Sequence, residues 1–512
     1  MFKRLVKNTT ILGIGTLFSR ILGLIRDILI AKYFGTSNVL EEFIVAFRAP
    51  NILRSIFGEG FSDSVATPAL SAYHKDKKKL FGIGNNLIFI FLLILVLIAL
   101  LGVMLSRYIV MLIAPGFVSD ASKFGLSISF MRIVFPYILF IGLASNFMAI
   151  LYAMKKFIGP AIVPSLLNVS FILGILFFRH AVGKFILVAC VIAGGLLQLI
   201  FSYLFLRLSG FRMHFSIKEA FGDKEVFSMF KRTVPRVWSS LVYQLNVLID
   251  TVFSSLSWIV GSGAMAAIYY SNRIVQFPLA LIALSVSRVA IVDFSRFSND
   301  GDMEGFKKLF VFSFQNIMFF IVPVSIVFIF ISRDIIQILF LRGKFNAYSL
   351  AVTSSTLFFY SFGLCFFCGI KLLVNAFYAL KDTSTPAKIA TIALIINAVL
   401  SAILMFPFKV GGIALASSIA ASFNFFLLLN ILRKRIGYID YGLIWREIFK
   451  LVIIGIILGV SAKAILAVPC SMFIRLAAAF LADLILLLVL GCIMKLKQAE
   501  ALIRWLKVLR KI

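Results

Sequence analysis

The stretch YAMKKFIGPA, from Tyr152 to Ala161, recurs as YALKDTSTPA, from Tyr378 to Ala387, at an offset of 226 residues. A weaker pair, GLIRD ending at Asp27 and VLID ending at Asp250, has an offset of 223 residues. Six predicted membrane spans separate the copies, so both copies should point the same way across the membrane. Parallel repeats of this kind form two lobes related by an axis along the membrane normal, with the substrate between them. The repeat therefore predicts two six-helix lobes related by a pseudo-two-fold along that normal.

The composition places the chain in a membrane. Of its 512 residues, 62% are hydrophobic and the mean hydropathy is +1.06, whereas soluble proteins contain about 45–50% apolar residues. Fourteen apolar runs are long enough to cross about 30 Å of hydrocarbon as helices, which predicts an all-α polytopic membrane protein with no removable signal peptide. The runs lie near residues 9–31, 39–58, 84–106, 125–153, 158–178, 184–207, 233–256, 263–292, 309–331, 348–378, 385–407, 411–432, 447–467 and 471–494.

The repeat covers twelve of these spans and leaves the last two outside it. We therefore expect an N-terminal lobe over residues 1–220, with spans one to six, and a C-terminal lobe over residues 221–440, with spans seven to twelve. Residues 441–512 then hold spans thirteen and fourteen and a basic cytoplasmic tail.

Lys and Arg outnumber Asp and Glu by 51 to 21, a formal net charge of +30. In a soluble protein this balance would suggest nucleic acid, but in a membrane protein basic residues gather in cytoplasmic loops and meet anionic headgroups. We expect contacts with anionic membrane lipids and no nucleic-acid binding. Loops rich in Lys and Arg alternate along the chain with loops that contain few of them. The loop with Arg333, Arg342 and Lys344 is an exception. This alternation predicts that both termini are cytoplasmic.

Several cations lie inside the predicted spans, where each costs about 2.5–3.5 kcal/mol on insertion scales. They are Arg20 and Arg26 in the first span, Arg48 and Arg54 in the second, Arg273 in the eighth and Lys371 in the tenth. Acids at that depth are few, namely Asp27, Glu59, Asp250 and Asp293. For each cation alone, snorkelling near an interface or a salt bridge to a neighbour such as Asp27 is as good an explanation as a bound ligand. Together they indicate an anionic ligand, and a guanidinium fork suits a diphosphate.

The first span raises a geometric question. At 100° per residue, Arg26 lies about 120° around the helix from Arg20, so a straight helix cannot aim both at one point. Either the span bends near Gly23, or one arginine serves a gate and the other the ligand.

A cation site is a further hypothesis. Asp250 lies deep in an apolar run, with Asn246 one turn before it, and a carboxylate beside an amide oxygen could bind Na⁺ or H⁺. Asp250 could equally be capped by hydroxyls or pair with Arg273. Further oxygens would come from Asn375, Asp382 and Asn397.

No catalytic constellation is found in the sequence. The three histidines lie far apart, no nucleotide-binding or nucleophile motif is present, and the five cysteines lie in or beside apolar runs, where we interpret them as packing residues. The sequence thus predicts a transporter without a cofactor. Transport would draw on coupling to Na⁺ or H⁺ or on the membrane potential.

Five motifs in order resemble the MurJ (MviN) lipid II flippases of the MOP exporter superfamily. They are FSRILGLIRD (18–27), AFRAPNILRSIFGEGFSDSVATPALS (46–71), APGF (114–117), YYSNRIVQFP (269–278) and YALKDTSTP (378–386). The resemblance implies fourteen helices, of which the last two form a lipid-facing groove. It also implies translocation of undecaprenyl-diphosphate-linked disaccharide pentapeptide to the outer leaflet of the bacterial cytoplasmic membrane, for peptidoglycan synthesis.

In that family, arginines of these motifs line the central cavity. By motif, the resemblance implies this role for Arg20, Arg26, Arg54 and Arg273; Ser19, Arg48 and Lys371 are secondary candidates. Some members bind Na⁺ in the C-terminal lobe, which favours Asp250.

The sequence departs from the family pattern in three places. Glu41 stands where the family usually has Asp, and Asn272 replaces an Asp before Arg273. The segment SRVAIVDFS adds Arg288 and Asp293 where a Pro-containing stretch is usual. These departures bear on gating and ion coupling more than on the class of substrate.

We expect a monomeric flippase that works by alternating access. The alternatives are another MOP-type exporter, such as a polysaccharide-lipid flippase or a multidrug antiporter, and an intramembrane transferase acting on prenyl lipids. An antiporter of cations should have a carboxylate-rich cavity and twelve spans. A transferase should have acidic metal-binding motifs in its loops.

Overall fold

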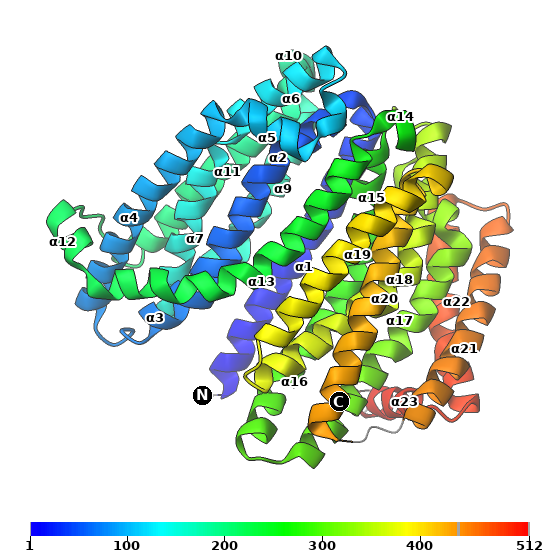
Figure 1. The fold of residues 1–512 in the computed structure, drawn as a ribbon. Helices are drawn as coiled ribbons and strands as arrows, with labels where there is room; N and C mark the ends of the chain where they lie inside the picture. Colours follow the sequence, from blue (N-terminus) through cyan, green and yellow to red (C-terminus); the bar gives the residue numbers. More distant parts are fainter. Residues whose placement is uncertain (1, 438–440, 510–512) are drawn as a thin grey trace. The chain divides into compact units, whose positions relative to one another are not determined.

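The computed structural model describes residues 2–437 and 441–509, where it contains helices and no strand. The side chains of residues 2–12, 14, 59, 232–243, 441, 443, 472–473 and 505–509 are outside the description. The side chains of Glu59, of the basic residues before Gly13 and of Lys507 in the basic tail fall there. Contacts divide the chain into two compact units, Met1–Leu256 and Ser257–Ile512, which Figure 1 colours in chain order.

The first unit is built from thirteen α-helices and four short segments of 3₁₀- or π-helix. They are α1 (Phe2–Phe34), α2 (Asn38–Ser55), η1 (Ile56–Ala66), α3 (Thr67–Ser71), α4 (Lys77–Met104), α5 (Ser106–Ile113), η2 (Pro115–Phe117), α6 (Ala121–Val134), α7 (Tyr137–Ala153), α8 (Ile158–Ile162), α9 (Ser165–Leu173), η3 (Gly174–Phe178), α10 (Arg179–Val182), η4 (Gly183–Phe185), α11 (Ile186–Arg207), α12 (Ile217–Gly222) and α13 (Lys224–Ser254).

The second unit consists of α14 to α23 and one π-helical segment. They are α14 (Ser257–Val260), α15 (Ala264–Pro278), η5 (Leu279–Ala283), α16 (Leu284–Asn299), α17 (Met303–Phe340), α18 (Ala347–Ala379), α19 (Ser384–Phe408), α20 (Val410–Ile436), α21 (Tyr441–Ala467), α22 (Met472–Ile493) and α23 (Lys497–Leu509). Helix α21 packs on α17, and α22 packs on α21. The last two predicted spans are thus attached to the second unit through α17.

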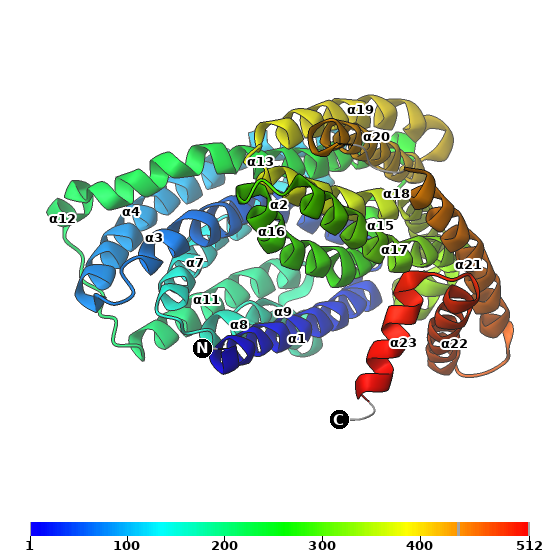
Figure 2. The ribbon, with the colours of Figure 1, turned by 90° about the horizontal axis from the view of Figure 1, so that it is seen from below.

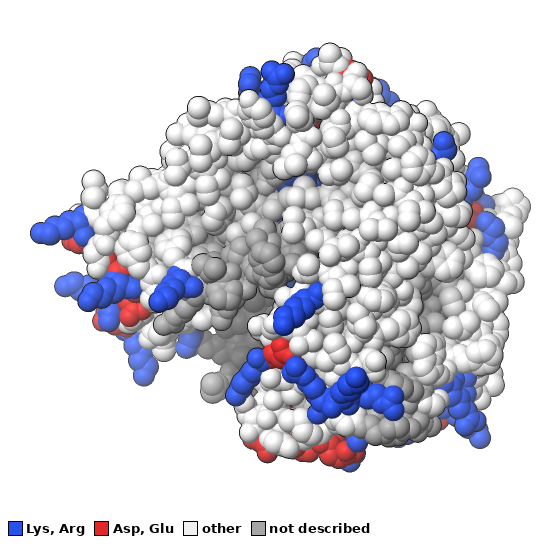
Figure 3. All heavy atoms as spheres, viewed as in Figure 1, with Lys and Arg blue, Asp and Glu red and all other residues white. Residues whose placement is uncertain are grey.

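Ten helical stretches of the described residues are long and apolar enough to cross a membrane, so the chain is a polytopic membrane protein. All fourteen predicted runs fall on helical segments, apart from short turns. Three of them, on α1, α2 and α13, are not among the ten. The runs on α1 and α2 carry several charged residues, and the run on α13 includes residues 232–243, which lie outside the description. Figure 3 shows the uncharged surface over α4 and over α18–α20, with Lys and Arg toward helix ends. The number of fourteen spans remains a prediction.

The two repeat copies end their helices in the same way. Lys155 and Lys381 both adopt the left-handed conformation, with φ of 59° and 60°. The amide of each donates to the carbonyl three residues back, at 2.9 and 3.0 Å, and the next amide donates five residues back, at 2.9 and 3.0 Å. This is the Schellman motif, which usually has glycine at the left-handed position. The sequence repeat is therefore a repeat of local backbone geometry.

Helix α13 packs within the first unit. It contacts α2, α4, α5 and η1, and the compact unit ends after it, at Leu256. The sequence repeat assigns the same helix to the C-terminal lobe, which it starts at residue 221. Compactness and the repeat therefore divide the chain at different places, and the lobe boundary stays a prediction.

Candidate functional site

Arg26 on α1 is held by two partners in the first unit. Its Nε and Nη2 donate to Asp27 Oδ1 at 3.0 and 2.8 Å, and its Nη1 donates to Asn168 Oδ1 on α9 at 2.8 Å. The guanidinium carbon lies 5.6 Å from the centre of the Phe171 ring. Asp27 is 3% exposed, so this is a buried, charge-assisted network. Arg26 therefore forms the salt bridge to Asp27 that the sequence analysis considered as an explanation of its charge.

Asn168 joins α1 to α9, and it was not found from the sequence. Its Nδ2 donates to the Ser19 carbonyl at 3.0 Å and lies 3.5 Å from Ser19 Oγ. The two helices run side by side in Figures 1 and 2. A Cβ at Gly23 would come within 3.7 Å of the same amide. The signal in the sequence was an amide in an otherwise apolar run, but only the fold shows that it contacts Arg26.

Arg20 lies on a different side of α1 from Arg26. Its side chain is exposed, and the helix runs from Phe2 to Phe34 as one continuous α-helix, without a break at Gly23. The predicted bend is therefore not present as a break in the helix. The separate tasks of the two arginines therefore stay a prediction.

Arg54 lies where α2 passes into the π-helix η1. Its Nε donates to Asn51 Oδ1 at 3.0 Å. The neighbouring Ser55 Oγ accepts from Gln244 Nε2 of α13 at 2.9 Å, which ties this junction to a third helix. Arg48, one and a half turns earlier on α2, is half-buried. π-Helical segments are rare and occur frequently at functional sites, which marks this junction as part of the candidate site.

The second unit carries the other two cations. Arg273 on α15 is exposed, and its guanidinium carbon lies 5.0 Å from the centre of the Tyr269 ring. Lys371 is half-buried on α18, a helix that packs against α15. The structure thus brings Arg26, Ser19 and Asn168 together in the first unit and places Arg273 and Lys371 on neighbouring helices of the second.

The predicted cation ligands are divided between the units. Asp250 is 7% exposed on α13 of the first unit, with Asn246 half-buried one turn before it. Asn375 of the second unit donates from Nδ2 to the Ser287 carbonyl at 3.0 Å, next to the unusual SRVAIVDFS segment. Among the described residues, no group of three or more His, Cys, Asp or Glu could hold a metal ion.

Asp382 has local partners that explain its charge. Its carboxylate accepts from the Ser384 and Thr385 amides and from the Thr385 hydroxyl, and pairs with Arg435 at 2.6 Å. Burial alone would raise the pKa of Asp382, but the hydrogen bonds from Thr385 and the charge of Arg435 hold it below its ordinary value. The carboxylate therefore stays ionised while it caps the start of α19 and binds the end of α20.

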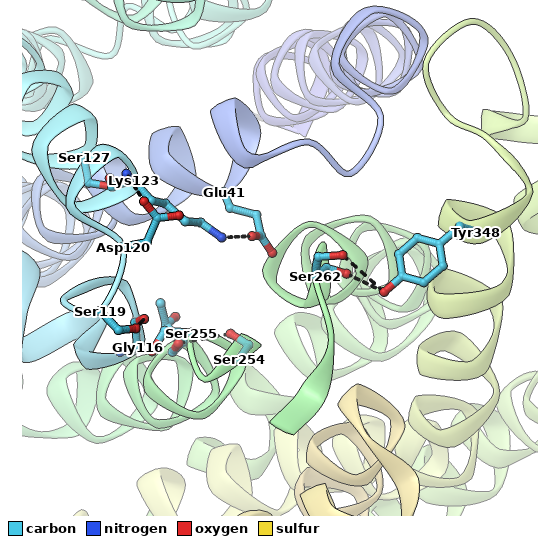
Figure 4. A network of polar contacts seen from close by, with 11 residues as sticks. Glu41, Gly116, Ser119, Asp120, Lys123, Ser127, Ser254, Ser255, Ser262 and Tyr348 are labelled. Atoms are coloured by element: carbon cyan, nitrogen blue, oxygen red, sulfur yellow. Dashed lines mark hydrogen bonds and ion pairs between the residues drawn. The ribbon is translucent and has the colours of Figure 1, made fainter. Parts of the chain in front are cut away.

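A buried ion pair joins α2 to α6 and was also not found from the sequence. Lys123 Nζ lies 2.5 Å from Glu41 Oε2, and the two residues are 5% and 2% exposed (Figure 4). The sequence analysis had noted Glu41 only as a departure from the family pattern. Its partner lies 82 residues away in the chain, so no local signal could have paired them.

The APGF motif holds the end of α13. Its Gly116 amide donates to Ser255 Oγ at 3.0 Å, and both residues appear in Figure 4. A Cβ at Gly116 would lie 2.1 Å from the Ser255 carbonyl oxygen, so only glycine permits this approach. The motif is therefore a packing contact between the 114–117 segment and α13.

Comparison with known proteins gives one consistent family. The family model described as lipid II flippase MurJ matches residues 30–493. A protein of Buchnera aphidicola subsp. Schizaphis graminum named probable lipid II flippase MurJ is 34% identical over 428 residues, covering 83% of this chain and 82% of the relative.

Two solved structures extend the comparison to the fold. One titled lipid II flippase MurJ, inward closed conformation, has 26% identity and a TM-score of 0.78, and covers 94% of this chain and 98% of its own. An inward-facing multidrug resistance MATE family transporter of the MOP superfamily has 14% identity and a TM-score of 0.65, covering 82% and 94%. The second likeness concerns the fold alone.

Proposed function

Because this chain belongs to the MurJ family of lipid II flippases, we propose that it carries lipid II from the inner to the outer leaflet of the bacterial cytoplasmic membrane. The observation that carries this proposal is the family match, which spans residues 30–493 and includes Arg54 and Arg273, whereas Arg20 and Arg26 lie before it. The activity is transport without a catalytic step, and it supplies precursor for the cell wall and so for cell shape.

Arg20, Arg26, Arg54 and Arg273 bind the diphosphate of the substrate, assisted by Ser19, Arg48 and Lys371. This is supported by the cost of placing several cations in membrane spans, which an anionic ligand would offset. On α1, Asp27 and Asn168 hold the Arg26 guanidinium in place, and the Arg20 side chain is exposed. The prenyl chain stays in lipid while the headgroup crosses.

The architecture proposed for this function has fourteen spans, in two six-helix lobes and a C-terminal pair. The matching left-handed caps at Lys155 and Lys381 support two lobes with the same direction. The alternation of basic loops supports cytoplasmic termini. Basic loops near the membrane also favour anionic lipids, since each Lys or Arg near such a surface contributes about 1 kcal/mol. The chain acts as a monomer.

Transport proceeds by alternating access. A solved relative in an inward closed conformation supports a cycle with distinct closed and open forms. The energy comes from the membrane potential, worth about 2.3 kcal/mol per charge per 100 mV, or from Na⁺ or H⁺ bound at Asp250 and Asn246. Asn375 and Asp382, in the second unit, are further ion-binding candidates. Export of lipid II that is unchanged both without Na⁺ and in Asp250→Asn would argue against the Asp250 site.

The experiment on the arginines uses a bacterium depleted of its own flippase and measures lipid II accessible at the outer face. Wild-type chain should restore accessible lipid II, whereas Arg54→Ala and Arg273→Ala should lower the rate by roughly tenfold or more, because a hydrogen bond to a charged group is worth about 1.5–3 kcal/mol. Arg107→Ala, an exposed arginine on α5, is the matched control. Equal rescue by all three variants would remove the proposed role of the arginines.

A further inference from the structure

Two consecutive glutamates lie in the first turns of α2, and both are buried. Glu41 is 2% exposed and Glu42 is 4% exposed. Burial of an ionised carboxylate is expensive unless a cation and hydrogen bonds compensate it. The surroundings of the two residues therefore have to supply two positive charges, or one of the carboxylates has to be neutralised in another way.

The nearest cation is already taken by Glu41. Lys123 Nζ lies 2.5 Å from Glu41 Oε2 and 4.3 Å from the centre of the Phe117 ring. Figure 4 shows the contact between the ammonium and the Glu41 carboxylate. Lys123 is itself 5% exposed, so the two charges neutralise each other in a buried site.

Glu42 has no such partner. Its Oε2 is fully buried and has no hydrogen-bond partner among the described residues. The charged groups that act on it are Lys123, Asp120, Lys184 and Glu41. Lys123 binds Glu41, Lys184 is exposed, and Asp120 adds a second negative charge while it caps α6. The site thus lacks one positive charge.

We propose that Glu42 is a binding site for a small monovalent cation, a proton or Na⁺, which neutralises its carboxylate in the first unit. Binding adds the cation to one carboxylate oxygen and breaks no covalent bond. When the cation leaves, Glu42 becomes a second anion beside Lys123 and competes with Glu41 for its ammonium. The occupancy of Glu42 therefore sets the strength of the contact between α2 and α6, and its effect on transport rests on the proposed function.

The test measures thermal unfolding of the purified full chain, which needs no lipid II and is independent of the proposed function. The wild type is measured from about pH 6 to pH 8 without Na⁺, and with Na⁺ or choline at constant pH. Glu42→Gln and Glu42→Met carry no charge to neutralise, so both should lose the response of the wild type. Glu304→Gln, which removes an acid at the surface, should keep it.

If the melting temperature falls with rising pH in the wild type but not in either Glu42 variant, the cation bound at Glu42 is a proton. A rise with Na⁺ relative to choline that disappears in the variants assigns Na⁺. The Met variant keeps the test decisive if the Gln variant fails to fold, because an apolar side chain of similar size fits a buried position. Identical responses of the wild type and the folded Glu42 variants to both pH and Na⁺ would overturn the proposal.

Discussion

At the scale of single residues, charged side chains in the spans contact partners that lie far away in the chain. Arg20, Arg26, Arg54 and Arg273 stand out because a charge in an apolar run is expensive wherever it occurs. Asn168 and Lys123 act through partners 142 and 82 residues away in the chain. Hydropathy and periodicity report on neighbours along a helix and contain no information about such pairs. The cost of placing a charge in an apolar span thus draws attention to the charged residues, but only the fold shows which residues contact them.

Asn168 is predicted to position Arg26 for transport. Asn168→Ala removes the acceptor for Arg26 Nη1 and the donor to the Ser19 carbonyl, and we expect lipid II transport to fall by roughly tenfold, the equivalent of about 1.4 kcal/mol. Asn168→Asp keeps an acceptor for Arg26 and should retain more transport than the alanine variant. Asn316→Ala, at an exposed amide on α17, is the control. Wild-type transport by Asn168→Ala would remove the residue from the site.

The left-handed lysines give a second prediction, read from thermal unfolding. A non-glycine residue with left-handed backbone costs about 1–2 kcal/mol, partly offset by the extra freedom that glycine gives the unfolded chain. Lys155→Gly and Lys381→Gly should therefore unfold at the same or a higher temperature than the wild type. Lys155→Val and Lys381→Val should unfold at a lower one, since a β-branched residue fits this conformation poorly.

The matched control for the lysines is Lys156, which follows Lys155 and has no positive φ. Its glycine variant should bring no gain in melting temperature. If valine at 155 and 381 is tolerated as well as glycine, the left-handed caps do not constrain these turns.

At the scale of the element, helices were predictable and their local departures were not. The fourteen apolar runs fall on helical segments, because burial of apolar length in a membrane requires helix. The π-helical segments η1, η3 and η5 were not predicted, since hydropathy does not distinguish π-helical from α-helical winding. Helix α1 runs through Gly23 without a break, and a bend there was one of two alternatives for Arg20 and Arg26. Hydropathy predicts that a helix forms, but tertiary packing determines where its hydrogen bonding changes from α-helical to π-helical.

Gly116 is predicted to be required for packing of the α13 end. Gly116→Ala would place a methyl group against the Ser255 carbonyl, and relief of such overpacking typically costs about 1–3 kcal/mol. Thermal unfolding of the purified chain should show the loss. Gly125→Ala on α6, where a Cβ meets open space, should instead be neutral or stabilising by up to about 1 kcal/mol. An equal effect of the two substitutions would contradict the packing role of Gly116.

At the scale of the whole molecule, the internal repeat bears on the architecture, and the family match bears on the substrate. The offset of 226 residues predicted two copies of a helical unit, and the caps at Lys155 and Lys381 show the same backbone geometry in both. The composition predicted a membrane protein, but it could not identify the substrate. That identification rests on the family match over residues 30–493, because the excess of cations in the spans by itself indicates only an anion.

The most direct measurement of the central claim is transport of lipid II by the purified chain in proteoliposomes. Lipid II starts in one leaflet, and its arrival in the other is followed with an impermeant probe, with and without a membrane potential. The account predicts transport well above that of empty liposomes, with a marked loss when Arg54 and Arg273 are both replaced by alanine. Transport no faster than in empty liposomes, from a chain that is folded and correctly inserted, would contradict it.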